Sequence, residues 1–134
     1  MIPHAGAMSL LDGVLHWDES SIRCVSVRHR DPGNPLRRVG GLGGFCGVEF
    51  AAQAMAVHGA LVAAGKPPRV GYLASLRDVR CMQPRLDVLD GDLTILAERL
   101  MGDERQAIYR FALDCRGAEV LTGRATVVLD AAPE

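Results

Sequence analysis

The chain has 134 residues, of which 49% are hydrophobic and 23% are charged, and its formal net charge is −1. This composition is typical of one globular domain with a real core, so it excludes a mainly disordered chain and leaves little room for a second domain. The near-zero net charge excludes a global basic field for nucleic acid, so no nucleic-acid partner is expected.

Two strands are expected in the first thirty residues. Residues 10–17 read as the first strand. Residues 22–29 alternate with a period of two, with Ile22 and Cys24 on one face, and this pattern predicts a second strand. Proline and glycine in residues 31–35 then break it.

A glycine-rich loop that leads into an apolar helix is the most informative part of the chain. A helix of small and apolar residues is predicted over 44–64. Its apolar stretch holds one carboxylate, Glu49, with Gln53 one turn later on the same face. A buried carboxylate is costly unless it is paired or protonated, which makes Glu49 a candidate acid or base. The bare helix start at Gly44 could present backbone N–H groups to a substrate oxygen.

Four more strands are expected after the helix, separated by good turn residues. They cover residues 70–82, 93–101, 107–115 and 120–129. The order predicts a single α+β domain over residues 1–134, in which a curved antiparallel sheet wraps a long central helix. Because the helix is apolar nearly all round, one sheet does not cover it, and a dimer is favoured.

The cysteines and apolar runs bear on cofactors and location. The four cysteines lack C-x-x-C spacing, so zinc is not expected and the thiols are expected to be reduced and mostly buried. They are Cys24, Cys46, Cys81 and Cys115. We expect no apolar run of the roughly 18 residues that a membrane span needs, and no secretory leader. A cytoplasmic protein without a membrane partner is therefore expected.

The histidines differ in their surroundings. His58 lies more than two helical turns after Glu49 and is expected to be a packed core histidine with a backbone partner. His16 is expected to be a strand or surface residue. His29 has polar neighbours that suit a surface turn, which leaves a catalytic role open.

Several segments together resemble one family. Residues 2–12 are similar to the Pro-His…Leu-Leu-x-Asp opening of the hotdog-fold 3-hydroxyacyl-carrier-protein dehydratases. Residues 49–53 resemble their acidic-x-x-Ala-Gln helix signature, and residues 71–78 resemble the strand that follows it, particularly in the aryl-polyene-type branch. The resemblance covers almost the whole chain. It implies a hotdog fold and the removal of water from a 3-hydroxyacyl thioester to give a trans-2-enoyl thioester, in fatty-acid or polyene-like biosynthesis.

The resemblance also implies roles for individual groups. Glu49 would protonate the leaving hydroxyl, which requires a pKa raised by burial. His29 or His4 would take the proton from C2. The N–H of Gly44 would polarise the thioester carbonyl. Gln53 would bind the catalytic carboxyl or a water, or would only pack the helix.

The resemblance implies partners as well. The substrate would be a thioester of acyl carrier protein or coenzyme A, and its phosphopantetheine arm would arrive with it, so no tight cofactor or metal is expected. Arg37 and Arg38 are candidate contacts to the phosphate or acidic helix of the carrier. Equivalent alternatives are Arg77, Arg80 and Arg85.

One departure from the family pattern keeps the function open. The family places its catalytic histidine fourteen residues before the acid, and this chain has Pro35 there. Three functions remain: a dehydratase that works as a dimer, an acyl thioesterase of the same fold, and a non-catalytic partner subunit of a heteromeric dehydratase. Free thiol instead of an enoyl product would identify the second. Activity only with another hotdog chain would identify the third.

Overall fold

The computed structural model describes residues 10–64, 66 and 71–129. Two strands, one long helix and four strands follow one another, in the predicted order. The strands are β1 (Gly13–Trp17), β2 (Ser21–Ser26), β3 (Gly71–Cys81), β4 (Leu93–Gly102), β5 (Gln106–Cys115) and β6 (Ala118–Leu129). The helices are two single 3₁₀ turns, η2 (Arg28–Arg30) and η3 (Gly44–Cys46), and the helix α1 (Gly47–Val62).

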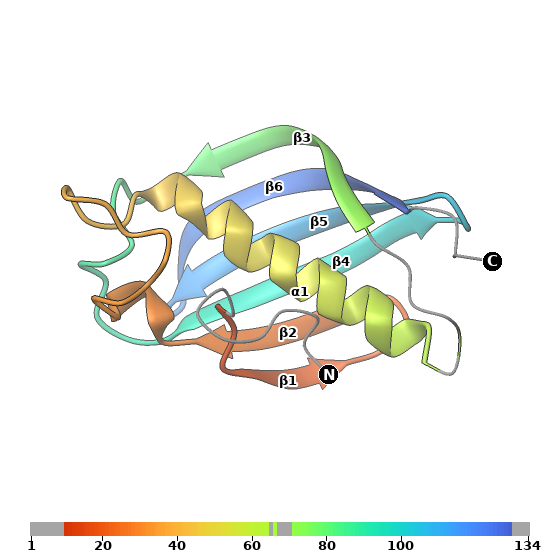
Figure 1. Cartoon of the computed structure of the whole chain (residues 1–134), viewed down its shortest axis with the longest axis horizontal. Helices are drawn as coiled ribbons and strands as arrows, with labels where there is room; N and C mark the ends of the chain where they lie inside the picture. Colours follow the sequence, from red (N-terminus) through yellow and green to blue (C-terminus); the bar gives the residue numbers. More distant parts are fainter. Residues whose placement is uncertain (1–9, 65, 67–70, 130–134) are drawn as a thin grey trace.

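All six strands belong to one antiparallel sheet in the order β1-β2-β4-β5-β6-β3. Figure 1 shows α1 lying across one face of this curved sheet. The predicted α+β arrangement, with one central helix wrapped by an antiparallel sheet, is therefore confirmed.

Alternation along the strands builds the core. In β5, Tyr109, Phe111 and Leu113 are buried, whereas the residues between them are more exposed. Successive side chains of a strand point to opposite faces, so this pattern separates a helix-facing side from a solvent side. Phe50 and Met55 of α1 complete the core from the helix.

The first two strands are shorter than predicted. Strand β1 begins at Gly13 because side chains hold the backbone before it: Leu10 N–H donates to Gln53 Oε1 (2.7 Å), and Leu10 O accepts from Ser26 Oγ (2.5 Å). Strand β2 ends at Ser26, where the chain turns into η2.

The helix differs from the prediction in two ways. It begins with the 3₁₀ turn η3, and α1 ends at Val62, two residues before the predicted end of the helix. By length and composition alone, the 19 residues Gly44–Val62 could cross a membrane, contrary to the expectation from the apolar runs. Nine of the sixteen residues of α1 are buried, so the segment fits the core helix of a folded domain.

The four cysteines are free, as predicted. Cys24 and Cys115 are buried, and Cys46 and Cys81 are half-buried. Burial raises the pKa of the Cys24 thiol to about 11, so this thiol stays protonated and unreactive near neutral pH.

Candidate active site

The start of the helix is held by backbone pairing between residues 42–44 and 84–86. Leu86 N–H donates to Leu42 O (2.7 Å), and Gly44 N–H donates to Pro84 O (2.9 Å). A Cβ on Gly44 would lie 1.9 Å from Gln83 O, so only glycine fits this close approach. The sequence therefore needs a glycine here for packing.

This packing contradicts the predicted role of Gly44. Its N–H already donates to Pro84 O, so it cannot also polarise a thioester carbonyl. The next backbone donor, the N–H of Phe45, has no acceptor among the described residues. The Phe45 side chain is 63% exposed, so the helix start is open on this side.

Glu49 lies in the first turn of α1, where a carboxylate is stabilised by the positive end of the helix. The turn sits tightly on the sheet because a Cβ on Gly47 would come within 3.0 Å of Leu113 and Leu121. The Glu49 side chain is exposed in the single chain. The burial expected around it is therefore not provided by its own sheet.

Gln53 has a structural contact. Its side chain is buried, and Oε1 accepts the Leu10 N–H described above. This bond ties the N-terminal segment to the middle of α1. Its predicted contact with a catalytic carboxyl or water stays a prediction.

His29 is fully buried, so the expectation of a surface turn is wrong. Its Nε2 lies 3.1 Å from Leu89 O; because a carbonyl only accepts, Nε2 carries the proton. Its Nδ1 is buried without a partner among the described residues. Burial lowers the pKa of His29, and the Leu89 hydrogen bond opposes this effect. No contact joins His29 to Glu49 within the described part of the chain, and His4 lies outside it.

The loop around Pro35 folds back on η2. The buried side chain of Asn34 donates through Nδ2 to Arg28 O (2.8 Å) and accepts Leu36 N–H at Oδ1 (2.9 Å). This asparagine closes the loop in which the family histidine was expected. Its role was missed from the sequence, where Asn34 gave only a turn signal.

Asp87 organises the loop before the helix, and no motif in the sequence marked it. Its carboxylate is 3% exposed, accepts Leu42 N–H (3.0 Å) and pairs with Arg85 and with Arg37 (3.6 Å). The hydrogen bond from Arg85 is the largest cause that lowers the pKa of Asp87. Arg37 and Arg85 are thus used inside the chain. Arg38 is exposed, and its guanidinium donates to the carbonyl oxygens of Pro35 and Arg37.

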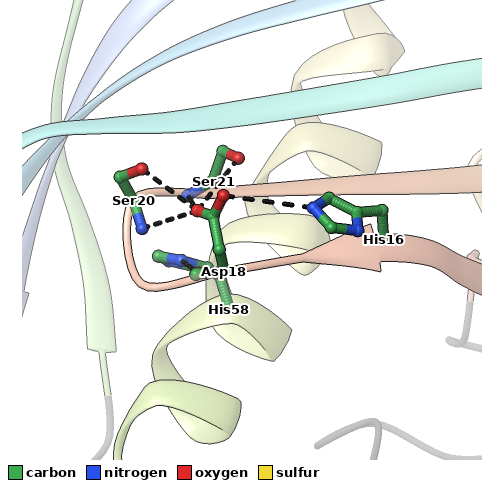
Figure 2. Close-up of polar contacts among 5 residues, drawn as sticks. All are labelled: His16, Asp18, Ser20, Ser21 and His58. Carbon is green, nitrogen blue, oxygen red and sulfur yellow. Dashed lines mark hydrogen bonds and ion pairs between the residues drawn. The ribbon is translucent and has the colours of Figure 1, made fainter.

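His58 is the packed core histidine that the sequence predicted. Its Nε2 lies 2.8 Å from Asp18 O, and its Nδ1 lies 2.7 Å from the hydroxyl of Tyr109. Figure 2 shows the adjoining turn, in which the Asp18 carboxylate accepts hydrogen bonds from Ser20 and Ser21. This network links α1 to β5 and to the β1–β2 turn, so it is structural.

The exposed position of His16 also agrees with the prediction. Its side chain is 73% exposed and lies 4.0 Å from the Asp18 carboxylate, as Figure 2 shows. Within residues 10–64, 66 and 71–129, no three His, Cys, Asp or Glu side chains gather closely enough to hold a metal ion.

Solved structures share this fold. A chain of the dehydratase heterocomplex ApeI:P from Xenorhabdus doucetiae superposes with a TM-score of 0.86 and 26% identity, over 97% of this chain and 88% of the other. A thioesterase variant from Staphylococcus aureus gives a TM-score of 0.70 at 11% identity, over 89% and 93% of the two chains. A thioesterase variant from Pseudomonas aeruginosa gives a TM-score of 0.66 at 14% identity, over 87% of this chain and 78% of the other.

These similarities confirm the hotdog fold, and the two thioesterases show the fold alone. No curated protein sequence matches the chain. The sequence model of the ApeP-like family, described as ApeP dehydratase, matches residues 1–133. Because that match spans nearly the whole chain, this protein belongs to the ApeP-like dehydratase family.

Proposed function

We propose that this chain is the acid-bearing subunit of a dehydratase that removes water from a 3-hydroxyacyl thioester on acyl carrier protein. The observation that carries the proposal is the position of Glu49. It lies exposed in the first turn of α1, beside the open helix start. The backbone there is fixed by the close packing of Gly44 and Gly47, which we call the glycine corner. The family membership and the similarity to a dehydratase heterocomplex support the reaction class.

The reaction needs an acid and a base on one substrate. A base takes the proton from C2 of the 3-hydroxyacyl thioester, and the C2–H electrons form the C2–C3 double bond. Glu49 gives its proton to the hydroxyl on C3, which leaves as water. The products are the trans-2-enoyl thioester and a Glu49 carboxylate. The N–H of Phe45, at the positive end of the helix, is the donor placed to polarise the thioester carbonyl.

The acid role of Glu49 requires that its side chain be buried in the active assembly. Burial favours the protonated form of a carboxyl, and the Glu49 side chain is exposed in the single chain. A second chain packed over the helix start would supply the burial. Edge strand β3 is open to such a chain: it is exposed along most of its 11 residues and presents Tyr72, Leu73 and Leu76.

The base is proposed to come from that second hotdog chain. His29 is turned into the core toward Leu89, and the family's histidine position is Pro35. His4 is the alternative within this chain. A base from the partner agrees with the heteromeric assembly of the similar dehydratase.

Arg38 is the proposed contact to the carrier within the loop before the helix. It is exposed and has no carboxylate partner in the described part of the chain, whereas Arg37 is held by Asp87. Its guanidinium suits the phosphate of the phosphopantetheine arm.

The experiment compares the purified chain alone with the chain co-expressed with each hotdog protein of the same organism. A 3-hydroxyacyl thioester of acyl carrier protein is the substrate, and mass spectrometry follows the loss of one water. The proposal predicts enoyl product only in a two-chain assembly. Full turnover by the chain alone would contradict the need for a partner. Free thiol without enoyl product would replace dehydration by thioester hydrolysis.

A further inference from the structure

The buried carboxylate of Asp87 takes no part in the proposed reaction, yet every contact it makes lies in the loop that leads to the helix start. Its Oδ1 accepts the Leu42 N–H (3.0 Å) and Nε–H of Arg85 (3.1 Å). Its Oδ2 pairs with the guanidinium groups of Arg85 and Arg37. The side chain is 3% exposed. One carboxylate therefore neutralises two arginines and binds one backbone N–H.

The backbone at Gly41 is shaped around this carboxylate. Its φ is +103°, which L side chains rarely adopt. A Cβ on Gly41 would also lie 2.5 Å from Asp87 Oδ2. The glycine thus lets the loop close directly on Asp87, and the carboxylate then fixes where Leu42 begins its pairing.

The pairing between residues 42–44 and 84–86 carries this anchor to the helix. Asp87 directly follows the second segment, and its bond to Leu42 closes one end of the pair. Gly43 and Arg85 form a bridge in the middle of the pair. Because each segment has only three residues, the Asp87 contact is a large part of what holds them in register.

The other end of the pair fixes the direction of the free donor. Gly44 N–H donates to Pro84 O, and Gly44 O accepts the N–H of Gly47. The N–H of Phe45 belongs to the same planar peptide group as Gly44 O. The contacts that hold Gly44 therefore also set the direction in which the Phe45 N–H points.

We propose that Asp87 is a positioning residue for the dehydration: it holds the loop so that the Phe45 N–H and the first turn of α1 meet the substrate in one fixed geometry. The inference rests on the proposed function, in which this N–H polarises the thioester carbonyl. A donor stabilises developing charge only when it is already aligned with it, and a misplacement of about 1 Å can cost about 10²-fold in rate.

The charge of Asp87 is what this role needs. Asp87→Asn keeps the size of the side chain but replaces one accepting oxygen by a donating NH₂ group. Arg37 and Arg85 would then face each other without their shared counter-ion. Both arginines and the Leu42 N–H lose part of their partner, so the loop is expected to shift and the helix start with it.

The experiment measures dehydration of a 3-hydroxyacyl thioester of pantetheine by the active two-chain assembly. This substrate has neither carrier protein nor phosphate, so a carrier contact does not enter the result. Asp87→Asn should lower kcat by about 10- to 100-fold with KM nearly unchanged, because the lost alignment acts in the transition state. In NMR spectra of the same assembly, with this chain labelled, the amide signal of Phe45 should move.

Asp103→Asn is the matched control. The Asp103 carboxylate also holds a turn, through the N–H groups of Arg105 and Gln106, and the substitution removes the same charge. Figure 1 shows that the β4–β5 turn, which contains Asp103, and the start of α1 lie at opposite ends of the sheet. This variant should keep kcat and the Phe45 amide signal of the wild type.

A second substitution tests the path of the effect. Arg85→Gln acts through the same carboxylate, so kcat should fall less than in Asp87→Asn, and the double variant should lose no more than Asp87→Asn alone. A double variant whose loss is the product of the two single losses would contradict this path.

The inference and the proposed function fail in different ways. If the wild type is active and Glu49→Gln is not, a kcat of Asp87→Asn equal to that of Asp103→Asn overturns the inference alone. An unmoved Phe45 amide signal, or a rise in KM with kcat unchanged, overturns it as well. Full activity of Glu49→Gln overturns the proposed function, and the positioning role with it.

Discussion

The buried histidine His58 predicts that acid weakens the fold. Its Nε2 proton is donated to Asp18 O, so its Nδ1 accepts the Tyr109 hydroxyl proton at 2.7 Å. Protonation would add a second N–H that faces this hydroxyl and would place a cation in the core. Burial lowers the pKa of His58 from its ordinary value of 6.5; nearby Arg99 lowers it further, and the Asp18 carbonyl and charge oppose the shift. The pKa of His29 is lowered mainly by its burial as well.

Proton linkage gives the direction and the size of this pH effect on the free energy of unfolding. A histidine whose folded-state pKa is depressed binds its proton first in the unfolded state, so stability is full above the unfolded pKa and falls as the pH drops below it. While the folded histidine stays neutral, each such group lowers the free energy of unfolding by about 1.4 kcal/mol per pH unit. From about pH 7.5 to about pH 5.5, His58 and His29 together therefore cost up to about 2.8 kcal/mol.

The assay is urea unfolding followed by circular dichroism at several pH values between these limits. His58→Gln cannot titrate, so it should remove about half of the pH slope, whatever it does to the stability at pH 7.5. His16→Gln is the matched control, because the His16 side chain is 73% exposed, and its slope should equal that of the wild type. The account of the network would be refuted by a wild-type free energy of unfolding that does not change with pH. It would also be refuted if the free energy of His58→Gln fell with pH as steeply as that of the wild type.

Two further substitutions test the glycine corner and the loop before it. Gly44→Ala should destabilise the fold by about 1–3 kcal/mol, because its Cβ would lie 1.9 Å from a backbone oxygen, whereas Gly40→Ala, with nothing within 4 Å, should not; urea unfolding compares them. Asp87→Asn should loosen the loop that carries Arg37 and speed tryptic cleavage at Arg37 and Arg38, whereas the exposed Glu104→Gln should not. Equal stability of the two glycine variants, or equal cleavage of the two acid variants, would contradict these contacts.

The sheet and helix were predictable because their signals are local. Period-two alternation and turn residues located β4, β5 and β6 to within one or two residues. The apolar run located α1, and the isolated carboxylate marked Glu49. Burial of His58 also followed, because it lies on a helix that is apolar nearly all round.

The local geometry of the site was not predictable, because it depends on partners distant in the sequence. The N–H of Gly44 is used by Pro84, forty residues away, and no local pattern shows that residues 42–44 pair with 84–86. His29 looks like a surface residue among charged neighbours, yet Leu89 holds it in the core. A carboxylate in an apolar helix suggests burial, but the face that carries Glu49 is left open by its own sheet.

The central claim is that Glu49 is the general acid of a dehydratase. The most direct measurement is the rate of enoyl thioester formation by Glu49→Gln in the same assembly as the wild type, with circular dichroism as the check on folding. Glutamine keeps the shape but has no proton to give, so the rate should fall by about 10²–10⁴ while the fold is kept. His29→Ala and His4→Ala, measured beside it, show whether either histidine of this chain is the base. Full activity of Glu49→Gln would contradict the claim.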